Sequence, residues 1–230
     1  MGAVNQAAEM THPPVAPSPR STYRHGDLHR ALLEAGVSLA RDGGPAAVTL
    51  REATRRAGVV PNAAYRHFAS HSELLAAVRS HALASAALSM ELELEALAPL
   101  AGRRTKAQVA VQARARLRAV GMGYVRFAVA EPGLFRTAFA SLLPPAETGD
   151  DPAARGRSGL GPYQLLAAAL DELVAAGVLP PGRRPHAEFV AWSAVHGLAM
   201  LVMDGPLHGT PPREIESLTE QVLDMVDRGI

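Results

Sequence analysis

The chain has 230 residues, of which 48% are hydrophobic and 20% are charged, and it contains no cysteine. This composition is typical of a globular protein and excludes a disulfide framework and thiol chemistry. No apolar run reaches the roughly 18 residues that a membrane span requires. The N-terminus lacks the apolar segment of a secretory signal, so we expect a cytoplasmic protein.

The net charge of +1 is unevenly distributed along the chain. Residues 20–81 contain nine arginines and five acidic residues, whereas residues 82–230 contain fourteen basic and sixteen acidic residues. A basic N-terminal third beside a mildly acidic remainder fits a DNA-binding unit joined to a body that does not touch DNA. A difference of this size also arises by chance, so it does not identify a function on its own.

The N-terminal residues 1–22 are expected to form a disordered arm, because residues 1–19 are proline-rich and show no hydrophobic periodicity. Arg24 follows this arm and could contact a DNA groove, although a solvated tail without a role fits the same residues. The first helix is predicted over about Asp27–Arg41. Asp27 would cap it, and the Gly-Gly-Pro sequence at 43–45 would end it.

A pair of short helices is predicted between Thr49 and Phe68. Thr49 with Glu52 forms a capping-box pattern, and Gly58 supplies the left-handed residue at which the first of the two helices stops. Pro61 suits the first position of the second helix, because its missing N–H costs nothing there. Two short helices joined by a glycine turn are typical of a helix-turn-helix unit, whose second helix enters the major groove of DNA.

These residues carry a specific resemblance. The sequence Ala-Gly-Val at 57–59, then Tyr65-x-His67-Phe68, then Ser-x-x-Glu-Leu-Leu at 70–75, resembles the DNA-binding domain of TetR-family transcription regulators. It departs from the family pattern at Val60, where Ser or Thr is usual, and at His71, where Lys is usual. A third departure is the pair at 53–54, Ala-Thr in place of Ile-Ala.

The resemblance implies a set of DNA contacts. Tyr65, His67, His71 and Thr49 match family positions that contact the phosphate backbone, and the amide of Asn62 has the geometry to read an adenine edge. A partly buried, purely structural role is the alternative for Tyr65 and His67. The predicted DNA-binding residues are Arg24, Thr49, Pro61, Asn62, Ala63, Tyr65, His67 and His71.

The rest of the chain is predicted to be helical, giving an all-α protein of about nine helices. We expect helices over about 72–97, 105–130, 134–143, 162–177, 185–204 and 212–227, separated by prolines and glycines. Residues 144–161 are expected to form a mobile loop. Glu91, Glu93 and Glu95 are interpreted as a solvated patch, as are the arginines at 114, 116 and 118, unless the two groups pair. The predicted domains are a helix-turn-helix head over 23–82, with its motif at 49–68, and a regulatory and dimerisation body over 83–230.

The sequence Trp192-Ser-Ala-Val-His196-Gly197 resembles the Trp-His-Gly signature of one subgroup of TetR C-terminal domains. His196 fits either a buried residue with one hydrogen bond or a pocket wall that orients a ligand. The family resemblance implies a body that binds a small molecule. Each candidate alone is as compatible with the core as with a ligand contact. The candidates are Met122, Tyr124, Phe127, Phe135, Phe139, Trp192, His196 and Met200, and their character favours an apolar or aromatic effector.

In this family the last two helices form a homodimer. Ile215, Leu218, Val222 and Met225 repeat at 3-4-3 spacing, which is typical of a helix–helix seam. These four residues are therefore predicted to lie at the dimer interface, although the same stripe could pack within its own chain.

No enzyme motif, cofactor motif or metal-ligand spacing is present in the sequence. We therefore expect no enzymatic activity, no cofactor and no metal. The predicted function is that of a sequence-specific regulator, a repressor that a small effector releases from a palindromic operator in double-stranded DNA. No residue excludes an activator instead of a repressor. The alternative from another class is a helical small-molecule-binding protein or enzyme with a vestigial head.

Overall fold

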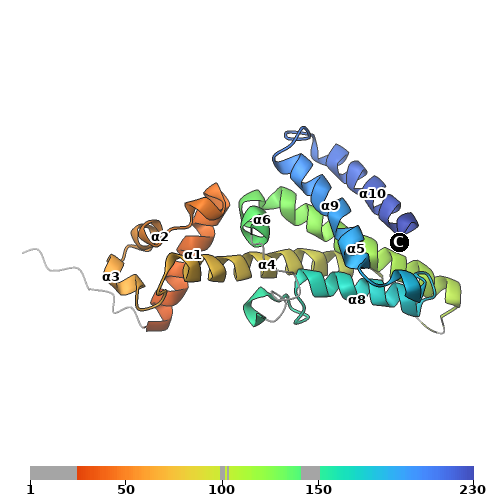
Figure 1. The fold of residues 1–230 in the computed structure, drawn as a ribbon, viewed down its shortest axis with the longest axis horizontal. Coiled ribbons are helices and arrows are strands. Elements are labelled where there is room, and N and C mark those ends of the chain that lie inside the picture. Colours follow the sequence, from red (N-terminus) through yellow and green to blue (C-terminus); the bar gives the residue numbers. More distant parts are fainter. Residues whose placement is uncertain (1–24, 99–101, 103, 141–150) are drawn as a thin grey trace, which may run out of the picture.

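The computed structural model describes residues 25–98, 102, 104–140 and 151–230. Within these ranges the chain forms nine α-helices and three short 3-10 helices and no strand, which confirms the all-α prediction (Figure 1). Arg24 and the predicted N-terminal arm lie outside the described residues. None of the described helices is long and apolar enough to span a bilayer.

The N-terminal head consists of α1 (His25–Gly43), α2 (Leu50–Ala57) and α3 (Pro61–Ala64), with a 3-10 turn over Pro45–Ala47. Helix α1 begins two residues before the predicted start, so Asp27 lies in its first turn and is not the N-cap. Gly58 ends α2 with a φ of 69°, the left-handed conformation that its position predicts. The side chains of Leu32, Val48 and Phe68 are almost fully buried in the head core.

The recognition segment is shorter as a regular helix than predicted. Helix α3 ends at Ala64, and the backbone N–H groups of His67 and Phe68 both donate to the carbonyl oxygen of Ala64. The residues to Phe68 therefore continue as a tight turn. At the start of α2, only one of the two hydrogen bonds of the predicted capping box forms. The side chain of Thr49 accepts from the N–H of Glu52, but the Glu52 carboxylate pairs with Arg55.

Helix α4 (His71–Glu95) is 25 residues long and belongs to both parts of the molecule (Figure 1). Its first turns pack against the head, and its remainder packs against α5 (Lys106–Ala130). Gly123 permits this close packing, because a Cβ there would lie 2.5 Å from the Cα of Met90. Helix α6 (Pro132–Phe139) follows after Glu131 alone. The predicted break at 131–133 is thus confined to one residue.

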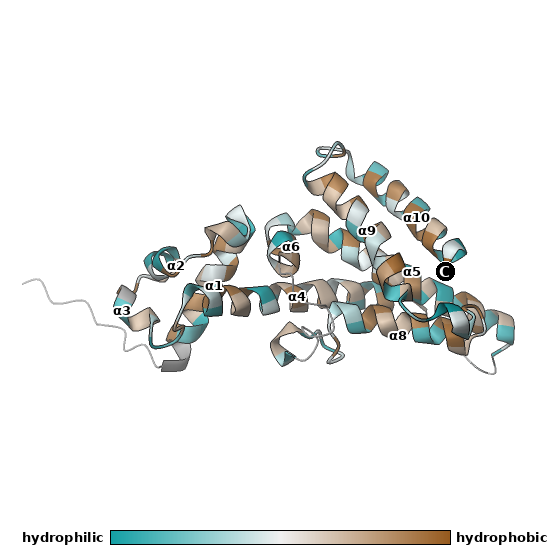
Figure 2. Cartoon of the chain, in the orientation of Figure 1, coloured by the Kyte–Doolittle hydropathy of each residue, from teal (hydrophilic) through white to brown (hydrophobic). Residues whose placement is uncertain are grey.

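The body is completed by α8 (Pro162–Ala175), α9 (Ala187–Met203) and α10 (Pro212–Gly229), with 3-10 turns over Pro152–Ala154 and Pro181–Arg183. Helix α9 starts two residues later than predicted, since His186 before it adopts a left-handed φ of 64°. Figure 2 shows apolar residues concentrated on α5, α8 and α9, in contrast to the hydrophilic α2. Leu134, Leu170, Leu173 and Leu179 are among the fully buried side chains of this core.

The arginines at 114, 116 and 118 do not form a solvated face and do not pair with Glu91, Glu93 or Glu95, since Glu93 pairs instead with Arg126 of α5. Arg114 and Arg118 form ion pairs with Asp227 and Asp224 of α10, and Arg116 lies 2.6 Å from Glu172 of α8. These pairs fasten α10 and α8 to α5. They are partly exposed, so each contributes only about 0–1 kcal/mol to stability.

Glu91 was predicted to be solvated, but its side chain is only 5% exposed. The carboxylate accepts hydrogen bonds from the backbone N–H of Arg157 at 2.8 Å and of Ser158 at 2.9 Å, and from the Ser158 hydroxyl. These bonds fasten residues 156–158 onto α4. The described part of the predicted mobile loop, residues 151–161, is therefore held in place.

Candidate functional site

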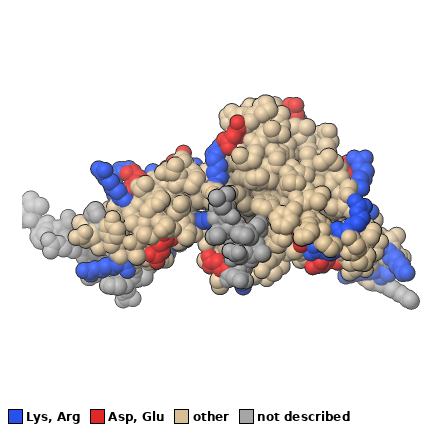
Figure 3. All heavy atoms as spheres, viewed as in Figure 1, with Lys and Arg blue, Asp and Glu red and all other residues tan. Residues whose placement is uncertain are grey.

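The head presents the predicted recognition residues at its surface. Tyr65 is 57% exposed, Asn62 and Arg66 are also exposed, and His67 and Ala63 are half-buried. A purely structural role for Tyr65 does not fit this exposure. Figure 3 shows basic and acidic side chains side by side on the viewed face of the head. Two arginines of the head are in ion pairs, Arg55 with Glu52 and Arg56 with Asp42.

Two of the predicted phosphate contacts also serve the fold. Thr49 caps α2, and the Nε2 of His71 lies 2.5 Å from the carbonyl oxygen of Val48, to which it donates. His71 thus ties the start of α4 to the segment before α2. The side chain of Phe68 stacks on His29 with ring centroids 4.6 Å apart, which anchors the end of the recognition turn to α1.

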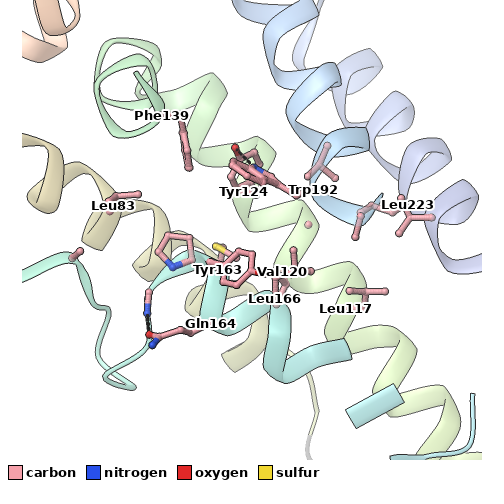
Figure 4. A pocket seen from close by; sticks show the side chains of 18 of the residues that line it. Leu83, Leu117, Val120, Tyr124, Phe139, Tyr163, Gln164, Leu166, Trp192 and Leu223 are labelled. Carbon is pink, nitrogen blue, oxygen red and sulfur yellow. Dashed lines mark hydrogen bonds between the residues drawn. The ribbon is translucent and has the colours of Figure 1, made fainter. Parts of the chain in front are cut away.

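The body contains a cavity of about 90 Å³ bounded by α4, α5, α6, α8, α9 and α10. Aliphatic residues form one part of its wall, namely Leu83, Leu117, Val120, Leu166 and Leu223 (Figure 4). Tyr124, Phe139, Tyr163 and Trp192 supply an aromatic part (Figure 4). The lining is therefore mostly apolar, as expected of a small-molecule site, but the volume is below the roughly 300 Å³ at which such sites begin.

Three of the eight predicted ligand residues line this cavity, namely Tyr124, Phe139 and Trp192. Phe127 and Phe135 are buried in the aromatic cluster behind them, with Phe135 centred 5.2 Å from Tyr124 and 4.8 Å from Phe139. His196 also lies in that cluster, with its ring centred 5.6 Å from that of Phe135. Met122 is half-buried and Met200 is 39% exposed, and neither belongs to the cavity wall.

A hydrogen-bonded chain forms part of the aromatic wall. The Nε1–H of Trp192 donates to the Tyr124 hydroxyl at 2.8 Å, and that hydroxyl donates to Nδ1 of His196 at 2.8 Å. Burial raises the pKa of Tyr124 and lowers the pKa of His196, so both groups are neutral near pH 7. His196 then carries its proton on Nε2. The Tyr124 hydroxyl donates and accepts within the wall and offers no free donor to a ligand.

Sequence reasoning missed the residues that α4 and α8 bring to the cavity. Arg79, Leu83 and Met90 of α4 and Tyr163 and Gln164 of α8 line it. The positions 79, 83 and 90 share one helical face, and this spacing was the available signal. A face of this kind identifies core as readily as cavity, so the sequence did not single it out.

The cavity is connected to the head through α6. Phe139 of α6 lines the cavity, and Arg79 of α4 donates from Nε to the carbonyl oxygen of Ala138 at 3.0 Å. At the other end of α6, Gly133 packs against the last turn of α1, and Glu131 pairs with Arg41 at 3.1 Å. A displacement of α6 at the cavity would therefore also move α1.

No group of three or more potential metal ligands occurs among the described residues.

Comparison with known families gives two matches. The family described as bacterial regulatory proteins, tetR family, matches residues 32–78, and the family described as tetracyclin repressor-like, C-terminal domain, matches residues 117–226. The second match contains the Trp192–Gly197 motif. A search of curated proteins gives no match.

Solved structures share the fold over most of the chain. A Rhodococcus sp. RHA1 protein of unknown function is 27% identical with a TM-score of 0.69, covering 92% of this chain and 99% of its own. The TetR-family regulator PfmR from Thermus thermophilus is 20% identical with a TM-score of 0.55, covering 86% and 97%. The regulator FadR from Bacillus subtilis, solved with stearoyl-CoA, is 13% identical with a TM-score of 0.59, covering 88% and 99%.

Proposed function

The chain belongs to the TetR family of DNA-binding transcriptional regulators, and on this premise we propose that it is a homodimeric repressor released from a palindromic operator by a small apolar effector. The observation that carries the proposal is the apolar cavity. Helices α4 and α6 both line this cavity and also pack against α1 of the head. The head would bind DNA and the body would respond to the effector.

In this proposal the recognition residues divide by role. Tyr65, His67 and Thr49 donate to phosphate oxygens and set the position of the head, whereas Asn62 reads a base edge in the major groove. Pro61 begins α3 at the groove, and the small side chain of Ala63 allows a close approach. His71 already donates to Val48, so its contribution to phosphate binding is limited to Nδ1.

The outer face of α9 supports a dimer. It carries exposed apolar side chains at Phe189, Val190, Met200 and Leu201. A Cβ placed on Gly197 of α9 would meet no atom within 4 Å, so a second helix has room to approach there. Exposed apolar side chains gathered on one helix face favour an interface. Two copies of α9 and α10 would then form a four-helix bundle around a two-fold axis.

The predicted stripe on α10 divides between the chain and this interface. Ile215 is buried within its own chain, Leu218 and Val222 are half-buried, and Met225 is 57% exposed. Leu218, Val222 and Met225 remain proposed dimer contacts, with Ile215 behind them in the core. The two-fold symmetry of such a dimer would present two heads to two half-sites one helical turn or more apart.

Effector binding would require the cavity to expand, because about 90 Å³ does not hold a drug-sized molecule. Expansion would displace part of the wall, for example Phe139 of α6 or the Tyr124–Trp192 wall of α5 and α9. An effector shifts the head only to the extent that it prefers the expanded form, so its differential affinity sets the degree of release.

The proposal is tested by measuring binding of the full-length protein to DNA. Random DNA fragments are selected on the protein, and the enriched sequence is then compared with its isolated half-site by fluorescence anisotropy at several salt concentrations. We expect saturable binding to a palindrome, weaker binding to the half-site and a decrease in affinity with salt. Equal, weak binding to all fragments would contradict the proposal and favour a vestigial head.

A further inference from the structure

Among the described residues that line the cavity, one is charged. This residue is Arg79, and the remaining wall is aliphatic or aromatic except for Gln164 and the polar atoms of the aromatic side chains. The Tyr124 hydroxyl is fully used by Trp192 and His196, and the Gln164 carbonyl oxygen accepts from the N–H of Gly161 at 2.9 Å. Arg79 is therefore the strongest polar group available to a ligand in this cavity.

The guanidinium of Arg79 is only partly satisfied. Its Nε donates to the Ala138 carbonyl oxygen at 3.0 Å, and no carboxylate of residues 25–98, 102, 104–140 or 151–230 lies within ion-pair distance. The two Nη atoms make no hydrogen bond within those ranges. Burial lowers the pKa of Arg79, which reflects the loss of water around the cation without a compensating anion.

The cavity extends away from Arg79 along α4. Leu83 and Met90 follow it on the same face, so the wall runs for about 16 Å along the helix axis. Leu117, Leu223 and Val226 close the far part of the wall with purely aliphatic side chains. The charge thus lies on the helical turn nearest the head, and the apolar surface lies beyond it. A molecule that matches this wall has an apolar body and an anionic group at one end.

We propose that the effector is an apolar molecule with a terminal anionic group, such as a carboxylate, and that Arg79 binds this group through its Nη atoms. This inference rests on the proposed function of the cavity as the effector site. The planar guanidinium can donate two parallel hydrogen bonds to a carboxylate or to a phosphate or sulfate ester. A neutral molecule of the same shape would bury the cation further without providing an acceptor of equal strength.

Binding of an anion at Arg79 would also affect the head through α6. Ala138 lies in the last turn of α6, where backbone carbonyl groups lack partners within the helix. Arg79 supplies such a partner now. An anion bound to the Nη atoms would reorient this guanidinium and so compete with its hydrogen bond to Ala138. The resulting shift of α6 would reach Gly133 and the end of α1.

The experiment compares ligands of matched shape and different charge on the full-length protein. Trp192 is the only tryptophan and lies in the cavity wall, so its fluorescence and calorimetry report binding. The probes are octanoate, octan-1-ol, octylamine and octyl sulfate. We expect octanoate to bind about 10-fold to 100-fold more tightly than octan-1-ol, because a hydrogen bond between two charged groups is stronger than one to a neutral hydroxyl. Octylamine should bind most weakly because it repels Arg79.

Two substitutions separate charge from structure. Arg79→Met should remove the preference for octanoate over octan-1-ol, and Arg79→Lys should retain a reduced preference. Arg118→Met is the matched control, because Arg118 pairs with Asp224 outside this cavity. Thermal unfolding of each variant shows whether the fold is retained, and the Lys variant keeps the test valid if the Met variant fails to fold.

The outcomes are distinct. An octyl sulfate affinity equal to that of octanoate supports any anionic group, and a higher affinity of octanoate identifies a carboxylate. The inference is overturned if octanoate binds no tighter than octan-1-ol, if it does not bind, or if the preference survives in Arg79→Met. Operator binding is measured on the same samples, and its absence in the wild-type protein contradicts the proposed function instead.

Discussion

Gly133 of α6 packs so closely against Ala40 of α1 that a Cβ on Gly133 would overlap the Ala40 carbonyl oxygen. This contact joins the body to the head at a point where no side chain separates the two backbones. Because backbone atoms cannot move aside as a flexible side chain can, the spacing between α6 and α1 is fixed by the absence of a Cβ. The contact lies on the path that connects the cavity to the head.

Gly133→Ala should therefore push α6 away from α1. We expect a loss of about 1–3 kcal/mol in the free energy of unfolding, typical of overpacking, and an altered operator affinity in the absence of effector. Denaturant titration and anisotropy measure the two effects. Gly182→Ala is the control, because a Cβ there meets no atom within 4 Å. Equal behaviour of the two variants would show that the contact is not tight in solution.

The recognition residues predict two different DNA-binding defects. Tyr65→Phe should weaken binding to all sequences by a similar factor, because a phosphate contact carries no sequence information. Asn62→Ala should reduce discrimination at one base pair by about 1–3 kcal/mol. Both side chains are exposed, so neither change should alter the unfolding temperature. Competition with mutated operators measures the difference, and unchanged discrimination by Asn62→Ala would refute its assigned role.

The Trp192–Tyr124–His196 chain predicts a stability effect. Tyr124→Phe removes the shared hydroxyl and leaves the indole N–H and Nδ1 of His196 unpaired, which should cost about 1–3 kcal/mol. Tyr163→Phe makes the same change elsewhere in the cavity wall, at a hydroxyl with no hydrogen bond to a described residue, and should be nearly neutral. Urea denaturation followed by Trp192 fluorescence compares the two, and similar losses would contradict the prediction.

Glu91 predicts an acid-dependent loss of stability. Burial alone would raise the pKa of this carboxyl, but the hydrogen bonds from Ser158 and Arg157 outweigh it and lower the pKa below the ordinary value of 4.5. A lowered folded-state pKa contributes stability that is present above pH 4.5 and is lost as the pH falls through the folded-state value. Unfolding measured from pH 7 down to acid should show this loss.

Glu91→Gln should remove that part of the pH dependence and lower stability at pH 7 by about 1–3 kcal/mol, because its NH₂ group cannot accept from the backbone of residues 157–158. Glu95→Gln is the matched control, since Glu95 is exposed and lies 3.5 Å from Arg157. An unchanged pH profile in Glu91→Gln would show that another group titrates.

The exposed face of α9 predicts the oligomeric state. Leu201→Glu should shift the protein from dimer to monomer in sedimentation experiments, because a charge cannot be buried unpaired in an apolar interface. Val111→Glu on α5 introduces the same charge at a position that is 67% exposed and should leave the dimer intact. A dimer that persists in Leu201→Glu would place the interface elsewhere.

Local signals in the sequence were sufficient for the presence of the helices and for some of their ends. Gly58, Pro61 and Pro162 act within one or two turns of the chain, and the structure starts or stops helices at these positions. The pairing of side chains required distances that sequence patterns do not contain. Arg114 meets Asp227 across 113 residues, and the partners of Glu91 lie 66 and 67 residues away. Three of the aromatic residues that line the cavity were predicted. The position of Arg79 in the cavity wall was not, because it depends on how α4 is oriented toward α8.

The continuity of α4 bears on how such proteins can be recombined. The predicted boundary between residues 82 and 83 falls inside this helix, where Val78 and Ala82 are buried on one side of the boundary and Leu83 and Ala86 on the other. A chimera that takes its head from a relative must therefore be joined in helical register. A joint with one residue too many would turn the head by about 100° about the helix axis. In the proposed dimer, both heads would then be turned out of the orientation in which they meet the two half-sites.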